Sequence, residues 1–144
     1  MEVKIFSAGV VVVRKEQGRF LYLLLRAYKH WDFPKGMVEA NETPLQAAIR
    51  EVEEETTITD LDFKWTELYM ETGPYGKGNK VARYYVAETQ QLDISLPINP
   101  ELGRAEHEEY IWSNYEGVKG LVSARVRSVL EWADNIIKYD ESPF

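Results

Sequence analysis

The chain has 144 residues, no cysteine, 44% hydrophobic residues and a formal net charge of −7, from 17 Lys and Arg against 24 Asp and Glu. This composition excludes a mainly disordered chain, a disulfide framework and a cysteine-ligated metal. No apolar stretch approaches the roughly 18–20 residues that a membrane-spanning helix needs. The acidic balance argues against broad binding to a nucleic-acid backbone, which requires a dense Lys and Arg surface. Because residues 1–4 also lack the basic start of a secretory signal, we expect one cytoplasmic domain over residues 1–144.

The first third of the chain predicts two strands followed by a long loop. Residues 8–13 are continuously apolar and rich in valine, as is typical of a strand buried on both faces. Residues 20–25 predict a second strand that forms a hairpin with the first. Residues 26–43 contain turn-favouring Pro34 and Gly36 and are expected to form a long loop.

A helix with a clear start follows this loop. Thr43 is suited to the N-cap, Pro44 to the first helical position, and Gln46 completes a capping box. Apolar residues then recur at helical spacing up to Val52. Because β-branched residues replace good helix formers at Thr56 and Thr57, the helix is expected to end there.

The second half of the chain predicts three more strands and one more helix. Residues 62–71 and 80–89 have strand-like patterns and flank a turn-rich loop over 73–79. A short strand is expected at 110–112, and apolar residues at helical spacing predict an amphipathic helix over 122–137. Two helices and five or six strands indicate an α/β fold in which helices cover a sheet.

The acidic run over residues 50–55 is the most unusual feature of the sequence. At about 100° per residue, the side chains of Glu51, Glu54 and Glu55 share one sector of the helix, beside its apolar stripe. Like charges four residues apart cost roughly 0.2–0.5 kcal/mol, so helix stability does not explain them. Such a group of oxygen ligands suits Mg²⁺ or Mn²⁺. The alternative is an acidic helix face that is simply solvated.

The segment from Gly36 to Ile58 resembles the Nudix box, G-x5-E-x7-R-E-U-x-E-E-x-G-U, where U is a bulky aliphatic residue. Glu42 and the run over residues 50–55 occupy the box's fixed acidic, basic and aliphatic positions. The one departure is Thr57, which stands where the family has a glycine that ends the helix. Because a β-branched residue is strained at positive φ, we expect the backbone to take a different path there.

The resemblance implies a Nudix-type α/β/α sandwich with a central mixed sheet. It also implies hydrolysis of a nucleoside diphosphate linked to another group, by water and divalent metal ions, with Mg²⁺ expected and Mn²⁺ possible as an alternative. By motif position, Glu54 would be a metal ligand or the catalytic base, and Arg50 would orient a carboxylate. Glu42 would support the junction between loop and helix. The implied metal ligands are Glu51, Glu55, Glu54 and the carbonyl of Gly36.

Shorter motifs indicate a subgroup of the family. Residues 31–36 resemble the W-x-x-P-K-G motif of the asymmetric diadenosine tetraphosphate hydrolases, and residues 80–88 resemble their K-x-x-x-Y-W-x-A-E strand. Residues 106–112 resemble the segment from which this subgroup supplies another catalytic or metal-binding glutamate, which places Glu106 in that role. RNA 5′-pyrophosphohydrolases share much of this pattern but usually carry glutamine where Lys35 stands.

This resemblance implies cleavage of diadenosine tetraphosphate to ATP and AMP. Tyr75 and Tyr84 would stack on adenine, although a surface position for Tyr75 and a core position for Tyr84 are equally consistent with the pattern. His30 and His107 are expected to be peripheral, since neither has metal-ligand spacing with another histidine. The residues expected to neutralise phosphate oxygens are Lys35, Lys80 and Arg26.

Three alternative functions stay open at this stage. The first is pyrophosphate removal from RNA 5′ ends, which would make RNA a partner. The second is the sanitation of nucleoside triphosphates, and the third is a nucleotide sensor without turnover. We expect a monomer without a membrane or a stable nucleic-acid partner, because no self-complementary apolar face is evident in the sequence.

Overall fold

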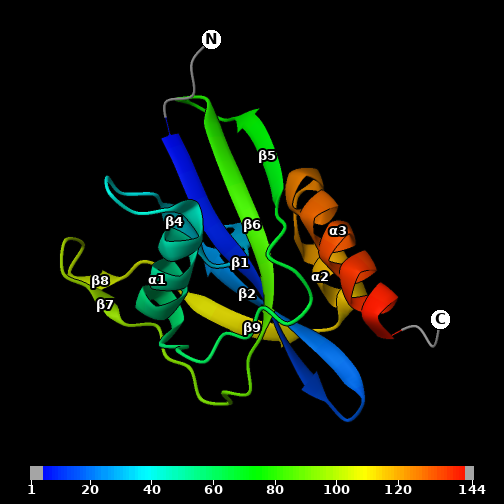
Figure 1. Cartoon of the computed structure of the whole chain (residues 1–144). Helices are drawn as coiled ribbons and strands as arrows, with labels where there is room; N and C mark the ends of the chain where they lie inside the picture. The colour runs from blue at the N-terminus through cyan, green and yellow to red at the C-terminus, as the bar shows by residue number, and fades with distance from the viewer. Residues whose placement is uncertain (1–4, 142–144) are drawn as a thin grey trace.

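A computed structural model describes residues 5–141. Residues 1–4 and 142–144 lie outside the described part, and so does the N-terminal segment that lacks the basic start of a secretory signal. The main sheet is mixed and contains seven strands, and Figure 1 shows it between one helix on one face and two helices on the other. The strands of this sheet are β1 (Ile5–Glu16), β2 (Arg19–Ala27), β3 (His30–Asp32), β4 (Lys35–Met37), β5 (Met70–Tyr75), β6 (Lys80–Glu88) and β9 (Glu109–Ser113). The other elements are α1 (Pro44–Thr56), α2 (Tyr115–Leu121), α3 (Ala124–Glu141) and a small two-stranded sheet of β7 (Ile98–Asn99) and β8 (Arg104–Ala105).

Strand β1 organises the sheet because it pairs with three other strands. It runs parallel to β6 along one edge, and along its other edge it pairs antiparallel first with β4 and then with β2. Strand β2 continues outward to β3 and β9, and β6 pairs with β5. The same edge of β1 therefore pairs with β4 over residues 7–9 and with β2 over residues 13–16. Strand β4 is followed in the chain by α1.

Two hydrophobic cores lie on opposite faces of the sheet. Along β1, Val10 and Val12 pack against α1, whereas Val11 and Val13 pack on the face covered by α3. This alternation is the period of two that an extended strand imposes. The continuous run of valines is thus explained by burial on both faces, and the expected α/β/α sandwich with a mixed sheet is confirmed.

The segment over residues 62–71 is mostly not a strand, contrary to the sequence-based prediction. Strand β5 begins only at Met70, and Asp62 makes an isolated bridge to Glu88. Phe63 packs in the core beneath α1, whereas Trp65 packs in the core beneath α3. Residues two positions apart in a strand would point to the same face, so this segment instead wraps around the edge of the sheet.

The predicted loop over residues 26–43 contains two short strands, β3 and β4. Strand β4 lies so close to β1 that a Cβ atom on Gly9 would be 2.2 Å from the carbonyl oxygen of Pro34. The sequence pattern could not reveal this pairing, because it depends on a close approach between distant segments. A third helix, the short α2, was also not predicted.

Helix α1 begins as the sequence predicts and ends with an unexpected conformation. Thr43 caps it, and both hydrogen bonds of the capping box with Gln46 are formed. Thr57 adopts the left-handed conformation (φ 66°, ψ 8°) that the family's glycine would favour, so the expected change of backbone path is wrong. The carbonyl of Thr57 accepts a hydrogen bond from the side chain of Gln91, and its hydroxyl accepts one from the backbone of Ser95, which hold it in place.

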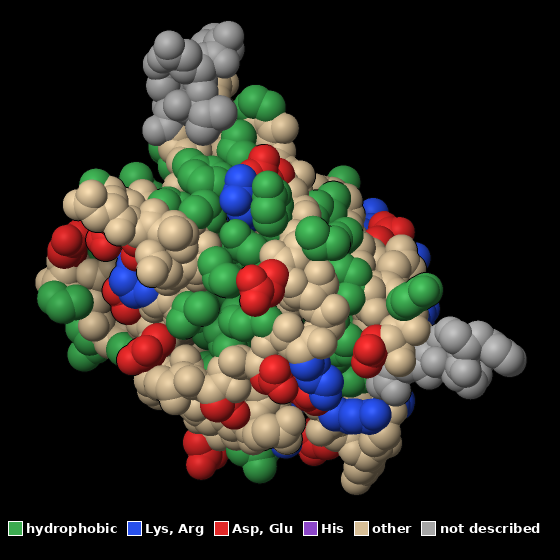
Figure 2. All heavy atoms as spheres, viewed as in Figure 1, with side chains coloured by type: hydrophobic (Ala, Val, Ile, Leu, Met, Phe, Trp, Pro, Cys, Tyr) green, Lys and Arg blue, Asp and Glu red, His purple; other side chains and the backbone are tan. Residues whose placement is uncertain are grey.

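The surface seen in Figure 2 carries charges of both signs among hydrophobic side chains, and the Lys and Arg side chains visible on this face lie next to Asp or Glu. Within residues 5–141, no helix has the length and apolar character needed to span a membrane.

Candidate active site

The acidic helix α1 forms one wall of a cleft of about 1100 Å³. The opposite wall comes from residues 96–101 and 105–107, which carry the small sheet of β7 and β8, and Figure 1 shows this segment beside α1. Met37 and Glu39 also line the cleft. The structure thereby brings together five of the residues selected from the sequence, namely Arg50, Glu51, Glu54, Glu55 and Glu106.

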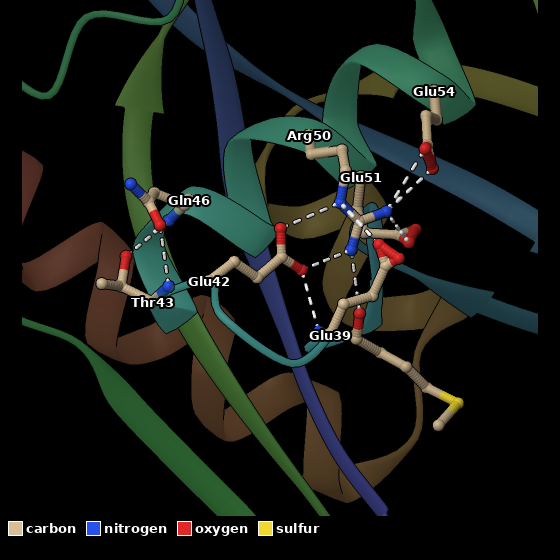
Figure 3. Close-up of polar contacts among 8 residues, drawn as sticks. Glu39, Glu42, Thr43, Gln46, Arg50, Glu51 and Glu54 are labelled. Atoms are coloured by element: carbon tan, nitrogen blue, oxygen red, sulfur yellow. Dashed lines mark hydrogen bonds and ion pairs between the residues drawn. The ribbon is translucent and has the colours of Figure 1, made fainter.

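Arg50 connects the acidic residues of the loop and the helix through hydrogen bonds. Its guanidinium donates through Nε and Nη2 to both oxygens of Glu42, at 3.1 and 2.7 Å, and Nη2 also donates to the carbonyl of Met37. Nη1 donates to Glu51 and to Glu54, each at 2.9 Å (Figure 3). Arg50 therefore ties the loop before α1 to two carboxylates of the helix, and this pairing raises its pKa and lowers that of Glu42.

Glu55 is the most deeply buried carboxylate of the site, with an exposed fraction of 8%. One oxygen accepts a hydrogen bond from the backbone N–H of Lys35 at 3.2 Å, and the other has no hydrogen-bond partner among the described residues. Burial raises its pKa well above the usual value, and repulsion from Glu106 and Glu51 raises it further. A buried, partly unpartnered carboxylate facing other acids is the environment that a bound cation would stabilise.

Glu51 occupies a narrow space beside β4. A Cβ atom on Gly36 would lie 2.0 Å from the carboxylate carbon of Glu51, so a larger residue there would displace this carboxylate. Burial raises the pKa of Glu51, while the hydrogen bond and the charge of Arg50 oppose this rise. Gly36 thus admits Glu51 to the position where its carboxylate meets Arg50.

His107 belongs to the site, contrary to the expectation that it would be peripheral. One ligand atom from each of Glu55, Glu106 and His107 lies within 4.8 Å of the other two, as in a metal-binding group. His107 is partly buried, and its desolvation lowers its pKa. The position directly after the candidate Glu106 was the only signal in the sequence that could have selected this histidine.

A second polar cluster lies on the other face of the sheet, beneath α3. The hydroxyl of Tyr84 donates to Asp32 at 3.0 Å, and Arg125 donates to both Asp32 and Tyr84. The guanidinium of Arg125 also lies 3.9 Å from the ring centre of Tyr75. The ring of Tyr84 is completely buried and packs edge-on against Phe33, so it offers no face to adenine, and the expected stacking role of Tyr84 is wrong.

The predicted basic residues lie outside the cleft. The side chain of Lys35 points toward Asp32 at 3.9 Å, while its backbone contacts Glu55, so Lys35 joins the two clusters. Lys80 begins β6 opposite Tyr75. Arg26 is engaged by Glu108 and Glu109 near the surface.

The sequence matches the family model for the NUDIX domain over residues 4–133. The chain belongs to the Nudix family. It is 36% identical to the asymmetrical bis(5′-nucleosyl)-tetraphosphatase of Caenorhabditis elegans over 115 residues, which cover 76% of this chain and 79% of that protein. It is also 28% identical to an RNA pyrophosphohydrolase of Bartonella bacilliformis over 146 residues, covering 85% of each chain.

The fold of this Nudix protein also matches solved structures. A C. elegans Ap4A hydrolase in a binary complex superposes with a TM-score of 0.78 at 27% identity, covering 94% of this chain and 98% of that one. The chain is therefore an enzyme of the Nudix hydrolase type, a family that uses divalent metal ions.

Proposed function

We propose that this enzyme hydrolyses the polyphosphate bridge of diadenosine tetraphosphate to ATP and AMP, acting as a monomer with Mg²⁺. The observation that carries the proposal is the cleft in which the partly unpartnered Glu55 lies with Glu51, Glu54 and Glu106. Relatives named as asymmetrical bis(5′-nucleosyl)-tetraphosphatases, which are 36% and 33% identical over 76% and 74% of the chain, support this substrate, as does the fold of the C. elegans Ap4A hydrolase.

The carboxylates of the cleft would have two different roles, metal binding and proton transfer. Glu51, Glu55 and Glu106 would hold the divalent ions, with the carbonyl of Gly36 as a further oxygen ligand. Bound ions neutralise the phosphate oxygens and lower the pKa of water. The Glu54 side chain lines the cleft and is about half exposed (55%), so it can contact both solvent and a bound substrate.

In the reaction, Glu54 would take the proton of the attacking water. The water oxygen forms a bond to a bridge phosphorus, the bond to the bridging oxygen breaks, and that oxygen leaves with the electron pair as part of the released nucleotide. Both carboxylate oxygens of Glu54 accept hydrogen bonds from Nη1 of Arg50, which holds this side chain in place on the helix. Arg50 acts as a positioning residue because it also orients Glu51.

The second polar cluster is suited to the nucleoside end of the substrate. The Tyr75 ring is already stacked against Arg125, which makes it a preorganised platform for adenine. Lys35 and Lys80 would neutralise bridge oxygens between this platform and the cleft. Arg26 is engaged by two glutamates, and it would contribute only if a substrate displaced them.

The test is incubation with diadenosine tetraphosphate and Mg²⁺, followed by separation of the nucleotides. Equal amounts of ATP and AMP are expected. Two molecules of ADP would contradict the proposed cleavage position. A second candidate is the removal of pyrophosphate from RNA, which the B. bacilliformis relative favours. The comparison is made with triphosphorylated RNA at the same concentration, which the first proposal expects to be cleaved more slowly than diadenosine tetraphosphate. Faster cleavage of the RNA would replace the first proposal.

A further inference from the structure

His107 approaches the carboxylate cluster from a different segment than α1. It lies between β8 and β9, next to Glu106, and both side chains come to the cleft opposite Glu55. Among residues 5–141 this is the one group in which three side chains of metal-ligating type bring their ligand atoms within 4.8 Å of one another. The group offers two carboxylates and one imidazole.

The carboxylate of Glu55 supplies an independent reason to expect a ligand here. It is more than nine-tenths buried, it lines the cleft, and one of its oxygens has no hydrogen-bond partner among the described residues. Glu106 faces it, and the two carboxylates repel each other when both are ionised. A cation in contact with both would satisfy the unpartnered oxygen and offset their repulsion.

We infer that His107 is a nitrogen ligand of one divalent metal position, together with Glu55 and Glu106. The inference deepens the proposed function, since it assigns a metal preference to the proposed hydrolytic site. Mg²⁺ strongly favours oxygen ligands, whereas Mn²⁺ accepts imidazole nitrogen as well as carboxylate oxygen. This position therefore selects Mn²⁺ over Mg²⁺, although the other carboxylates of the cleft suit either ion.

The geometry favours ligation over a purely structural role for His107. No hydrogen bond or ion pair of its ring is found among the described contacts, although Glu106, Asp32 and Lys35 act on it electrostatically. His107 is partly buried, and a histidine that only supports the structure is usually held by at least one such bond. The nearby carboxylates would favour a cation beside the ring, and Lys35 opposes this only in part.

The inference is tested on the full chain, loaded with one equivalent of Mn²⁺, by electron spin echo envelope modulation. Coordinated imidazole produces modulation from ¹⁴N, which should be present in the wild type and should change to the ¹⁵N pattern when the histidines carry ¹⁵N. The modulation should disappear in His107→Gln and persist in His30→Gln, a matched control because His30 is the other histidine of the chain and lies exposed on β3. In His30→Gln the one remaining labelled imidazole is that of His107, so this variant decides the matter even if His107→Gln does not fold.

Calorimetric titration supplies the second measurement. His107→Gln should weaken Mn²⁺ binding about tenfold or more and change Mg²⁺ binding by less than about twofold. The inference would be overturned if His107→Gln weakened the binding of Mn²⁺ and Mg²⁺ equally. It would also be overturned if the wild-type spectrum lacked ¹⁴N modulation, either because Mn²⁺ does not bind or because it binds through oxygen alone. Both readouts are independent of turnover, so ¹⁴N modulation without formation of ATP and AMP would reject the proposed substrate and retain the ligand.

Discussion

Gly36 and Glu51 lie so close together that a Cβ atom on Gly36 would be 2.0 Å from the carboxylate carbon of Glu51. Strand β4 and helix α1 therefore approach each other at a point where a side chain at position 36 would take the space of the Glu51 carboxylate. The contact couples the loop of the Nudix box to its acidic helix.

Gly36→Ala is expected to displace the Glu51 carboxylate and to lower turnover of diadenosine tetraphosphate about 100-fold, because a misplacement of about 1 Å has an effect of this size. Steady-state kinetics with Mg²⁺ would measure it. The control is Gly120→Ala in α2, where an added Cβ would meet no atom within 4 Å. Similar rates for both variants would show that the position of Glu51 does not control the chemistry.

Glu55→Gln should stabilise the metal-free protein while abolishing its response to metal. Removing a buried charge that faces Glu51 and Glu106 should raise the free energy of unfolding in EDTA by about 1–3 kcal/mol. Divalent metal should raise the Tm of the wild type and leave that of the variant almost unchanged. Thermal unfolding with and without metal checks both effects; lower stability of the variant in EDTA would contradict the argument.

Glu54→Gln is expected to lower turnover by about 100- to 10,000-fold, since it removes the proposed proton acceptor. Because half of this side chain is exposed, the free energy of unfolding should change by less than about 0.5 kcal/mol. Glu131→Gln, an exposed glutamate on α3, should retain full activity. Single-turnover measurements separate the chemical step from product release, and a normal chemical step in Glu54→Gln would assign the base to another residue.

Thr57→Gly should increase the free energy of unfolding by about 0.5–1 kcal/mol. Glycine adopts the left-handed conformation of this position without the steric cost that a β-branched residue bears. The substitution removes the hydroxyl that accepts from Ser95, but the backbone N–H of Ser95 also donates to the carbonyl of Thr56. Denaturant titration measures the change, and Thr59→Gly, at an exposed position without positive φ, should instead destabilise.

Local interactions explain which features could be predicted from the sequence. The start of α1 depends on hydrogen bonds between Thr43 and Gln46, three residues apart. In β1, valine occupies consecutive positions because both faces of the strand are buried. The acidic sector of α1 follows from helical periodicity alone. These signals are read over a few residues, so they need no knowledge of the rest of the fold.

Contacts between distant segments decided the rest. Tyr84 has the alternation of a strand residue, but only Asp32 and Arg125 determine that its hydroxyl is satisfied in the interior. The left-handed conformation of Thr57 is supported by Gln91 and Ser95, which outweigh its local preference.

The sequence by itself determined the sandwich of helices and sheet, the course of α1 and the group of glutamates on it, because propensity, capping and periodicity are local. Only the tertiary structure decided which carboxylate is buried, that Gly36 makes room for Glu51, and that His107 meets Glu55 across the cleft. Gly36 and Glu51 are 15 residues apart and His107 and Glu55 are 52 apart, and packing between such separate segments leaves no periodic pattern in the sequence.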